Sequence, residues 1–205
     1  MVWVKICGIT DLETALYSAE AGADALGFVF APSIRRIAPE AARLISLELP
    51  SRVLKAGVFV NSTIKEVQQI IEFCRLDIAQ LHGDESQEYC RQINGNCKVI
   101  KAFNVQSPLF GLIDSYPADA VLIDTFLPGK AGGTGEVFDW KSLESLNRTK
   151  PVILAGGLNQ SNVKEAVLSV RPDGVDVSSG VETNQKKDLV KIMQFINSVK
   201  EVTHL

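Results

Sequence analysis

Short apolar runs recur along the chain, and they have the two-residue period of β-strands. From Val2 to Cys7, apolar side chains alternate with Trp3, Lys5 and Cys7, so the two sets fall on opposite faces. Each run is bounded by polar or glycine-containing segments. The eight runs predicted as strands are Val2–Cys7, Ala25–Phe30, Val53–Val60, Ile78–His82, Val99–Phe103, Ala120–Thr125, Val152–Ala155 and Gly174–Ser178.

Between these runs, apolar residues recur every three or four positions, which is the period of an amphipathic helix. Thr10 and Glu13 have the spacing of a capping box, Pro39 and Asn159 are favoured near helix starts, and Gly22 is favoured at a helix end. The predicted helices are Asp11–Ala21, Pro39–Leu47, Ile64–Cys74, Ser86–Ile93, a weak one near Pro108–Ser115, Trp140–Leu146, Gln160–Val170 and Lys187–Val199.

Eight strand–helix units without a composition break predict an α/β protein with one domain over residues 1–205, folded as a single (β/α)₈ TIM barrel with a parallel eight-stranded sheet. A doubly wound open sheet is the main alternative, but it would normally have fewer strands. It also lacks support from a G-x-G-x-x-G motif, because Gly8 stands alone after the first strand. An aspartate precedes every even-numbered strand, which indicates either a period of two units or a turn preference for this residue: Asp24, Asp77, Asp119 and Asp173.

Composition excludes several classes of partner. The formal charge is −3 and no block of basic residues is present, which argues against nucleic acid and anionic membranes as partners. No apolar run has the length of a membrane span or a signal region, so we expect a cytoplasmic protein. The four cysteines lack C-x-x-C spacing, and only His82 and His204 could join them as ligands, so we expect neither a structural zinc site nor a disulfide framework.

In such a barrel the active site is built at the carboxyl ends of the strands and in the loops that follow. Cys7 and Asp124 end the first and sixth strands, and a thiol and a carboxylate across one barrel mouth would form an acid–base couple. Asp124 could instead only fix the loop after it. The other polar or glycine residues at these ends are Arg35 and Arg36, Asn61, His82 and Gly83, Gly156 and Gly157, and Ser178, Ser179 and Gly180.

The last two of these groups predict a phosphate site. Gly156 and Gly157 let backbone amides approach an anion, and Ser178, Ser179 and Gly180 add hydroxyls and more amides. The loop 126–135 after the sixth strand contains four glycines, which suits a lid over bound substrate.

Parity along the strands also predicts a buried ion pair. Asp176 faces inward from the middle of the eighth strand, and Lys5 faces inward from the first strand, which is its neighbour when the barrel closes. Pairing removes the penalty of isolated buried charges. Since Lys5 lies on the same face as Cys7, its positive field is expected to favour the Cys7 thiolate over the ordinary thiol.

Together, these motifs resemble the phosphoribosylanthranilate isomerase family over nearly the whole chain. The matching segments are Lys5–Thr10, Gly22–Phe30, Gln80–Gly83, Leu122–Thr125, Gly132–Gly135 with Phe138–Trp140, Leu154–Leu158 and Val175–Glu182. Each motif is modest alone, but their order and spacing are specific.

The resemblance implies the Amadori rearrangement of N-(5-phosphoribosyl)anthranilate to 1-(2-carboxyphenylamino)-1-deoxyribulose 5-phosphate in tryptophan biosynthesis, without a cofactor. It further implies that Asp124 is the general acid and Cys7 the general base. Arg35, within Ser33–Ile37, takes the place of the family arginine that holds the anthranilate carboxylate, although Arg36 adjoins it. His82 matches a position in the barrel mouth.

Two alternatives remain beside the isomerase. An indole-glycerol-phosphate synthase-like lyase would use more lysines and glutamates in the mouth, where Lys101 has suitable parity. A non-catalytic phosphometabolite-binding barrel would keep the phosphate site without the acid–base couple. In each reading the partner is a small phosphorylated molecule, and the protein is a monomer or a homodimer.

Overall fold

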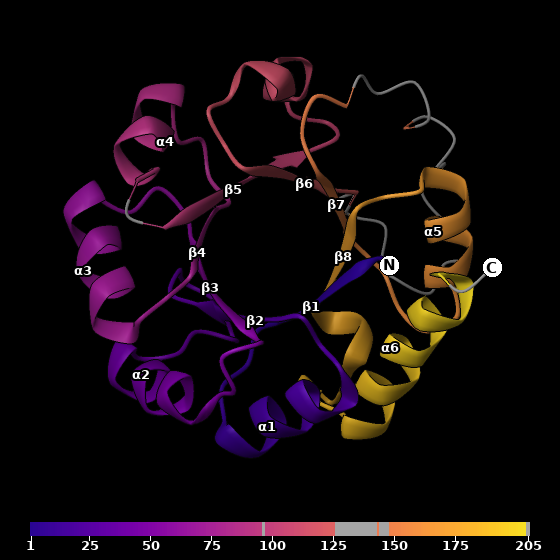
Figure 1. Ribbon diagram of the computed structural model, residues 1–205. Coiled ribbons are helices and arrows are strands. Elements are labelled where there is room, and N and C mark those ends of the chain that lie inside the picture. The colour runs from indigo at the N-terminus through magenta and orange to yellow at the C-terminus, as the bar shows by residue number, and fades with distance from the viewer. Residues whose placement is uncertain (96, 126–142, 144–147, 204–205) are drawn as a thin grey trace.

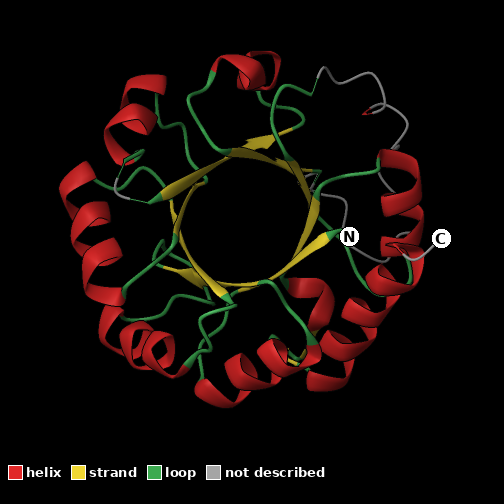
Figure 2. Ribbon diagram, viewed as in Figure 1, coloured by secondary structure: helices red, strands yellow, loops and turns green. Residues whose placement is uncertain are grey.

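The strands close into a barrel in sequence order. The computed structural model describes residues 1–95, 97–125, 143 and 148–203. Within them, eight strands follow one another around the ring, and β1 pairs in parallel with β8 to complete it. Helices surround the ring on its outside (Figures 1 and 2). The predicted (β/α)₈ class is confirmed, and the open-sheet alternative is wrong.

The elements lie close to their predicted bounds. The barrel strands are β1 (Trp3–Cys7), β2 (Ala25–Val29), β3 (Leu54–Phe59), β4 (Ile78–Leu81), β5 (Lys98–Asn104), β6 (Ala120–Asp124), β7 (Val152–Ala155) and β8 (Gly174–Val177). The helices are α1 (Leu12–Ala21), α2 (Pro39–Glu48), α3 (Ile64–Cys74), α4 (Gln87–Ile93), the 3₁₀ helix η1 (Pro108–Ser115), α5 (Val163–Val170), the 3₁₀ helix η3 (Ser179–Val181) and α6 (Leu189–Thr203). A short antiparallel pair, β9 (Glu182–Thr183) and β10 (Lys186–Lys187), precedes α6.

Alternate residues of each strand enter two separate cores. A small cluster that includes Ile78, Ile100, Leu122 and Ile153 fills the inside of the barrel. The large cluster packs the outward-facing strand residues against the helices, and it includes Val175 and Val177 of β8. The outward-facing apolar residues of the strands and the inward-facing apolar residues of the helices therefore form one packed layer between the sheet and the helices.

The aspartates before the even-numbered strands join pairs of strands. Asp24 Oδ2 lies 2.8 Å from the amide N of Val4, and the Asp24 amide donates to the carbonyl of the same Val4. The same reciprocal contact joins Asp77 to Lys55, Asp119 to Val99 and Asp173 to Val152. We call these four contacts the aspartate clamps. Each clamp joins an odd-numbered strand to the next even-numbered strand. The two-unit period therefore reflects how the strands are joined, and a preference of turns for aspartate does not explain it alone.

Three helix starts differ from prediction. Asp11, and not Thr10, caps α1, since its carboxylate accepts from the Thr14 amide at 2.8 Å. The capping box predicted there is wrong. α5 begins after Asn162, because the Asn159 side chain accepts from the Ser161 amide in a turn before the helix. α6 begins at Leu189 because the two preceding lysines belong to β10. The other start and end signals, Pro39 and Gly22, are confirmed.

Lys101 faces away from the barrel interior, contrary to the predicted parity. Its neighbours Ile100 and Ala102 lie in the inner cluster, so the lysine side chain lies outside the sheet. There its Nζ lies 3.0 Å from Glu85 Oε2 and 2.6 Å from the Gly83 carbonyl. Lys101 therefore fastens the loop after β4 and brings no charge to the barrel mouth.

Two predicted features lie outside the described residues: the loop 126–135 and most of the predicted helix Trp140–Leu146. His204 lies outside them as well. Among the described helices, none is both long enough and apolar enough to cross a membrane.

Candidate active site

A cavity of about 330 Å³ opens where the barrel strands end. Its lining brings together eight residues predicted from the sequence: Cys7, Arg35, His82, Asp124, Gly156, Gly157, Ser178 and Ser179. Four other candidates do not line it. Arg36 is exposed on the loop after β2, and Asn61 accepts from the Asp84 amide with its Oδ1. The Gly83 amide donates to the Glu85 carboxylate, and Gly180 packs behind the lining.

Cys7 lines the cavity and is buried. It pairs in register with Gly27, where an added Cβ would lie 2.8 Å from the Cys7 sulfur, so glycine leaves room for the thiol. Burial raises the pKa of the Cys7 thiol, and the nearby Lys5 lowers it by less. The expectation that Lys5 would favour the thiolate overall is therefore wrong, because desolvation outweighs the lysine's field.

The predicted ion pair beneath the thiol is present. Lys5 Nζ lies 2.8 Å from Asp176 Oδ1, the lysine side chain is 0% exposed, and the two residues are register partners across the β1–β8 seam. Because both side chains are buried, water has little access to either charge. The pair therefore fixes two charges directly below Cys7.

Replacing Lys5 with methionine is expected to destabilise the protein and raise the pKa of Cys7. The change leaves the Asp176 carboxylate buried without its cation, which typically costs about 3–5 kcal/mol in the free energy of unfolding. It also removes the group that most strongly opposes the effect of burial on the pKa of the thiol. Urea denaturation and thiol titration measure the two effects. The double replacement Lys5→Met with Asp176→Asn should recover part of the stability, and no recovery would contradict the pairing argument.

Asp124 ends β6 and faces the same cavity as Cys7. Its Oδ2 lies 3.4 Å from Nε2 of His82, which follows β4. On the other side of the ring, Nδ1 of His82 lies 3.1 Å from Nε2 of the buried Gln80. The Gln80 amide nitrogen is a donor only, so Nδ1 of His82 accepts in this contact and Nε2 is the ring nitrogen that faces Asp124.

The loops after β7 and β8 form a backbone-rich wall of the cavity. Gly156 and Gly157 both adopt positive φ, at 88° and 68°, a conformation that glycine takes without strain. In the next loop a Cβ on Gly180 would lie 1.8 Å from the carbonyl oxygen of Leu158. Gly180 therefore lets the two loops touch, and Ser178 and Ser179 reach the cavity beside Gly156 and Gly157. Amides and hydroxyls gathered in this way suit an anion such as phosphate.

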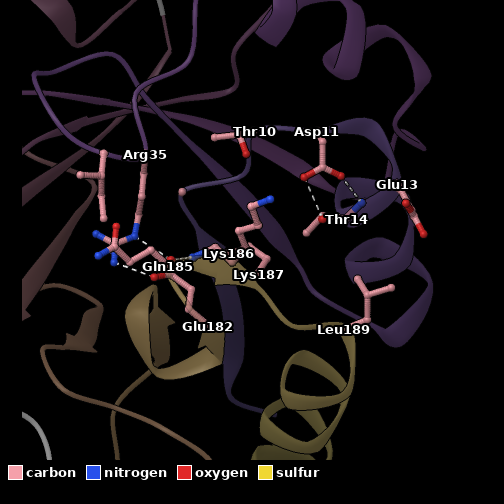
Figure 3. Close-up of a pocket in the computed structure, with 12 residues that line it drawn as sticks. Thr10, Asp11, Glu13, Thr14, Arg35, Glu182, Gln185, Lys186, Lys187 and Leu189 are labelled. Carbon is pink, nitrogen blue, oxygen red and sulfur yellow. Dashed lines mark hydrogen bonds and ion pairs between the residues drawn. The ribbon is translucent and has the colours of Figure 1, made fainter.

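Arg35 lies between this cavity and a second one of about 480 Å³ beside α1 and the β9–β10 pair (Figure 3). Its Nε and Nη2 donate to the two carboxylate oxygens of Glu182 at 2.6 and 2.8 Å. The Glu182 side chain is 6% exposed and also contacts Lys187 Nζ at 2.6 Å. Hydrogen bonding to Glu182 raises the pKa of Arg35 more than burial lowers it, so the guanidinium is charged.

Sequence reasoning missed three residues of this region. Gln80 and His82 lie in the same matching segment, but their contact depends on two side chains facing the same way, one from β4 and one from the residue just after it. Glu182 and Lys187 come after the last barrel strand, and only the short β9–β10 pair returns them to Arg35. The pairing of a charged residue with Arg35 across 147 positions has no local signal in the sequence.

Among the described residues, no group of three or more histidine, cysteine, aspartate or glutamate side chains has the arrangement of a metal site.

Comparisons with known proteins agree on one family. The family model for N-(5'-phosphoribosyl)anthranilate isomerase matches residues 4–198. The enzyme of that name from Desulforudis audaxviator is 54% identical over 204 residues, which is 98% of this chain and 99% of the relative. The phosphoribosyl anthranilate isomerase structure from Thermotoga maritima has a TM-score of 0.89 and 45% identity, with all of both chains covered.

A second solved isomerase, in complex with reduced 1-(o-carboxyphenylamino)-1-deoxyribulose 5-phosphate, has a TM-score of 0.87 and 44% identity, covering 98% of this chain and 100% of that one. The order of the strands, the site at their carboxyl ends and these matches lead to the same assignment. The chain belongs to the N-(5'-phosphoribosyl)anthranilate isomerase family, and it is an isomerase of tryptophan biosynthesis.

Proposed function

We propose that Asp124 and Cys7 carry out the Amadori rearrangement of N-(5'-phosphoribosyl)anthranilate as general acid and general base. Asp124 donates a proton to the ring oxygen of the ribose, and the bond between that oxygen and C1 breaks to give a Schiff base. The Cys7 thiolate then removes the proton from C2, and the electrons of that C–H bond form the enolamine. Tautomerisation of the enolamine gives the ketone.

The observation that carries this proposal is that a thiol and a carboxylate from nearly opposite strands, β1 and β6, line one cavity with the glycine and serine loops. The phosphate is assigned to Gly156, Gly157, Ser178, Ser179 and the backbone that Gly180 allows to approach. With the phosphate there, the ribose carbons extend over the barrel mouth between the two groups. His82 lines the cavity beside Asp124 and is assigned a contact with the substrate.

Turnover of freshly prepared N-(5'-phosphoribosyl)anthranilate tests the reaction directly, because the substrate's fluorescence falls as it is converted. The expected result is a fluorescence decrease in proportion to the protein added. Absence of turnover by folded protein, shown by circular dichroism, would remove the assignment of these roles.

Arg35 is assigned to the anthranilate carboxylate, and Arg36 serves as a matched control. Replacing Arg35 with methionine is expected to lower kcat/KM by about 10–100-fold, since hydrogen bonds to charged groups contribute about 1.5–3 kcal/mol each. Arg36→Met removes the same charge at an exposed neighbouring position, so kcat/KM should change by less than about twofold. Equal losses in the two variants, measured by the fluorescence assay, would contradict this assignment.

We also propose that the protein is cytoplasmic and is either a monomer or a homodimer. One solved structure is of monomers generated from the dimeric phosphoribosylanthranilate isomerase of Thermotoga maritima. All four cysteines are free thiols, which suits a reducing compartment. Sedimentation equilibrium at several protein concentrations distinguishes the two states.

A further inference from the structure

Glu182 lies between two basic side chains at the edge of the cavity. Figure 3 shows Arg35, Glu182 and Lys187 turned toward one another in the region between the loop after β2 and the β9–β10 pair. The carboxylate receives two bonds from Arg35, and its Oε1 is shared with Lys187 Nζ. The Lys187 side chain is 3% exposed, so this contact is nearly shielded from water.

Lys187 extends the same network to the proposed phosphate loop. Its Nζ lies 3.0 Å from the carbonyl oxygen of Ser178 and 3.4 Å from the Ser178 hydroxyl. Ser178 in turn lines the cavity. A continuous chain of contacts therefore runs from Arg35 through Glu182 and Lys187 to Ser178.

The charges of this chain do not cancel. Arg35 and Lys187 are two basic groups, and Glu182 is one acidic group. Burial lowers the pKa of Lys187, and its hydrogen bond to Glu182 opposes that effect. Burial raises the pKa of Glu182, but hydrogen bonds from Arg35 and Lys187 hold it below its ordinary value, so the carboxylate stays ionised near neutral pH. The Nη1 group of Arg35 makes no hydrogen bond to the part of the chain that the structure describes. One positive charge and one free edge of the guanidinium remain for an anionic group of the substrate.

We propose that Glu182 and Lys187 are positioning residues: Glu182 orients Arg35 toward the substrate's ring carboxylate, and Lys187 fastens Glu182 to the phosphate loop at Ser178. This inference rests on the proposed function, because it takes Arg35 as the group that binds the carboxylate. Two parallel bonds to Glu182 fix the plane of the guanidinium before substrate arrives. Substrate binding then costs less conformational entropy, because the Arg35 side chain is already ordered.

Two ligands separate this role from a general structural one. The first probe is reduced 1-(o-carboxyphenylamino)-1-deoxyribulose 5-phosphate, and the second is the same molecule without the ring carboxylate. Glu182→Gln is expected to weaken the first probe by about 3–10-fold, since one immobilised side chain typically contributes that much, and to leave the second unchanged. Glu13→Gln removes a carboxylate from the lining of the neighbouring cavity without touching Arg35, and it should change neither affinity.

The contacts of Glu182 also predict how variants of Arg35 and Lys187 should behave. In an Arg35→Met background, Glu182→Gln should have no additional effect on either probe, because the group it orients is gone. Lys187→Met should weaken both probes, since it releases Glu182 and the Ser178 carbonyl together. Equal weakening of both probes by Glu182→Gln, or additive effects of Glu182→Gln and Arg35→Met, would overturn the proposal.

A measurement on the wild-type protein tests the proposal even if the variants fail to fold. In ¹⁵N-labelled protein, the Nε–H of Arg35, bonded to Glu182 at 2.6 Å, should exchange with water much more slowly than that of the exposed Arg36. Equally fast exchange at both positions would overturn the proposal. If instead Arg35→Met weakens the two probes equally, the carboxylate assignment in the proposed function fails, whatever the result for Glu182.

Discussion

Cys7→Ser is expected to lower kcat/KM by about 10²–10⁴-fold, the usual contribution of a general base. The serine hydroxyl fits the space that Gly27 leaves beside the thiol, so the cavity keeps its shape. A hydroxyl is a far weaker acid than a thiol and gives almost no anion at neutral pH. The fluorescence assay measures the loss, and binding of the reduced product analogue should be retained because the phosphate and carboxylate contacts are intact.

The pH dependence gives an independent check on the same residue. Because burial raises the pKa of Cys7 despite the opposing effect of Lys5, the thiol predominates at neutral pH. The reactive thiolate increases as the pH rises, so kcat/KM of the wild type should rise on the alkaline side until the thiol is fully ionised. This limb should be missing from Cys7→Ser. Cys97→Ser, at a half-buried thiol outside the cavity, is the control. A Cys7→Ser enzyme with nearly wild-type activity would exclude the thiol as the base.

Asp124→Asn is expected to cause a loss of about the same size, 10²–10⁴-fold in kcat/KM. The amide has nearly the same shape as the carboxyl group but cannot donate an acidic proton to the ring oxygen. The amide can still contact His82, which lies 3.4 Å from Oδ2, so the fold around β6 should persist. Ring opening would become rate-limiting in this variant.

The exposed Asp84, on the loop after β4, provides the matched control for Asp124. Asp84→Asn makes the same chemical change near the barrel mouth and should leave kcat/KM within about twofold. Retained analogue binding by Asp124→Asn, together with lost turnover, is the expected pattern for an acid. If both asparagine variants kept full activity, the proton donor would have to be another group.

Strand parity and barrel closure together predict much of this site. Once Cys7 and Asp124 are placed at strand ends, the carboxyl edge of the barrel brings them into one cavity, as the structure shows. The ion pair between Lys5 and Asp176 also follows, since the first and last strands must be neighbours in a closed ring. These predictions succeed because they depend only on a period of two and on the order of the strands.

Features that depend on loops and on competing energies were not predictable in the same way. Glu182 reaches Arg35 only because residues 184 and 185 adopt positive φ and fold β9 back on β10. The face of Lys101 is not predictable because β5 carries apolar residues on both faces, with Val99 and Phe103 in the outer core and Ile100 and Ala102 in the inner one. For Cys7, the sign of the pKa shift depends on whether burial or Lys5 has the greater effect, and only the structure shows how deeply the thiol is enclosed.

Four of the eight strand pairings in the barrel carry an aspartate clamp between strands that are neighbours in sequence, and the β1–β8 pairing joins the two ends of the barrel sequence. Each clamp joins residues only 20 to 22 positions apart, whereas Lys5 and Asp176 are separated by 171 positions. Short loops cost less entropy to close than long ones, so strand pairs within each quarter of the ring are expected to form ahead of the β1–β8 seam. The seam is also where the charges beneath Cys7 meet. In a nascent chain, the environment of the reactive thiol is therefore completed only when the last strand has been made and the ring has closed.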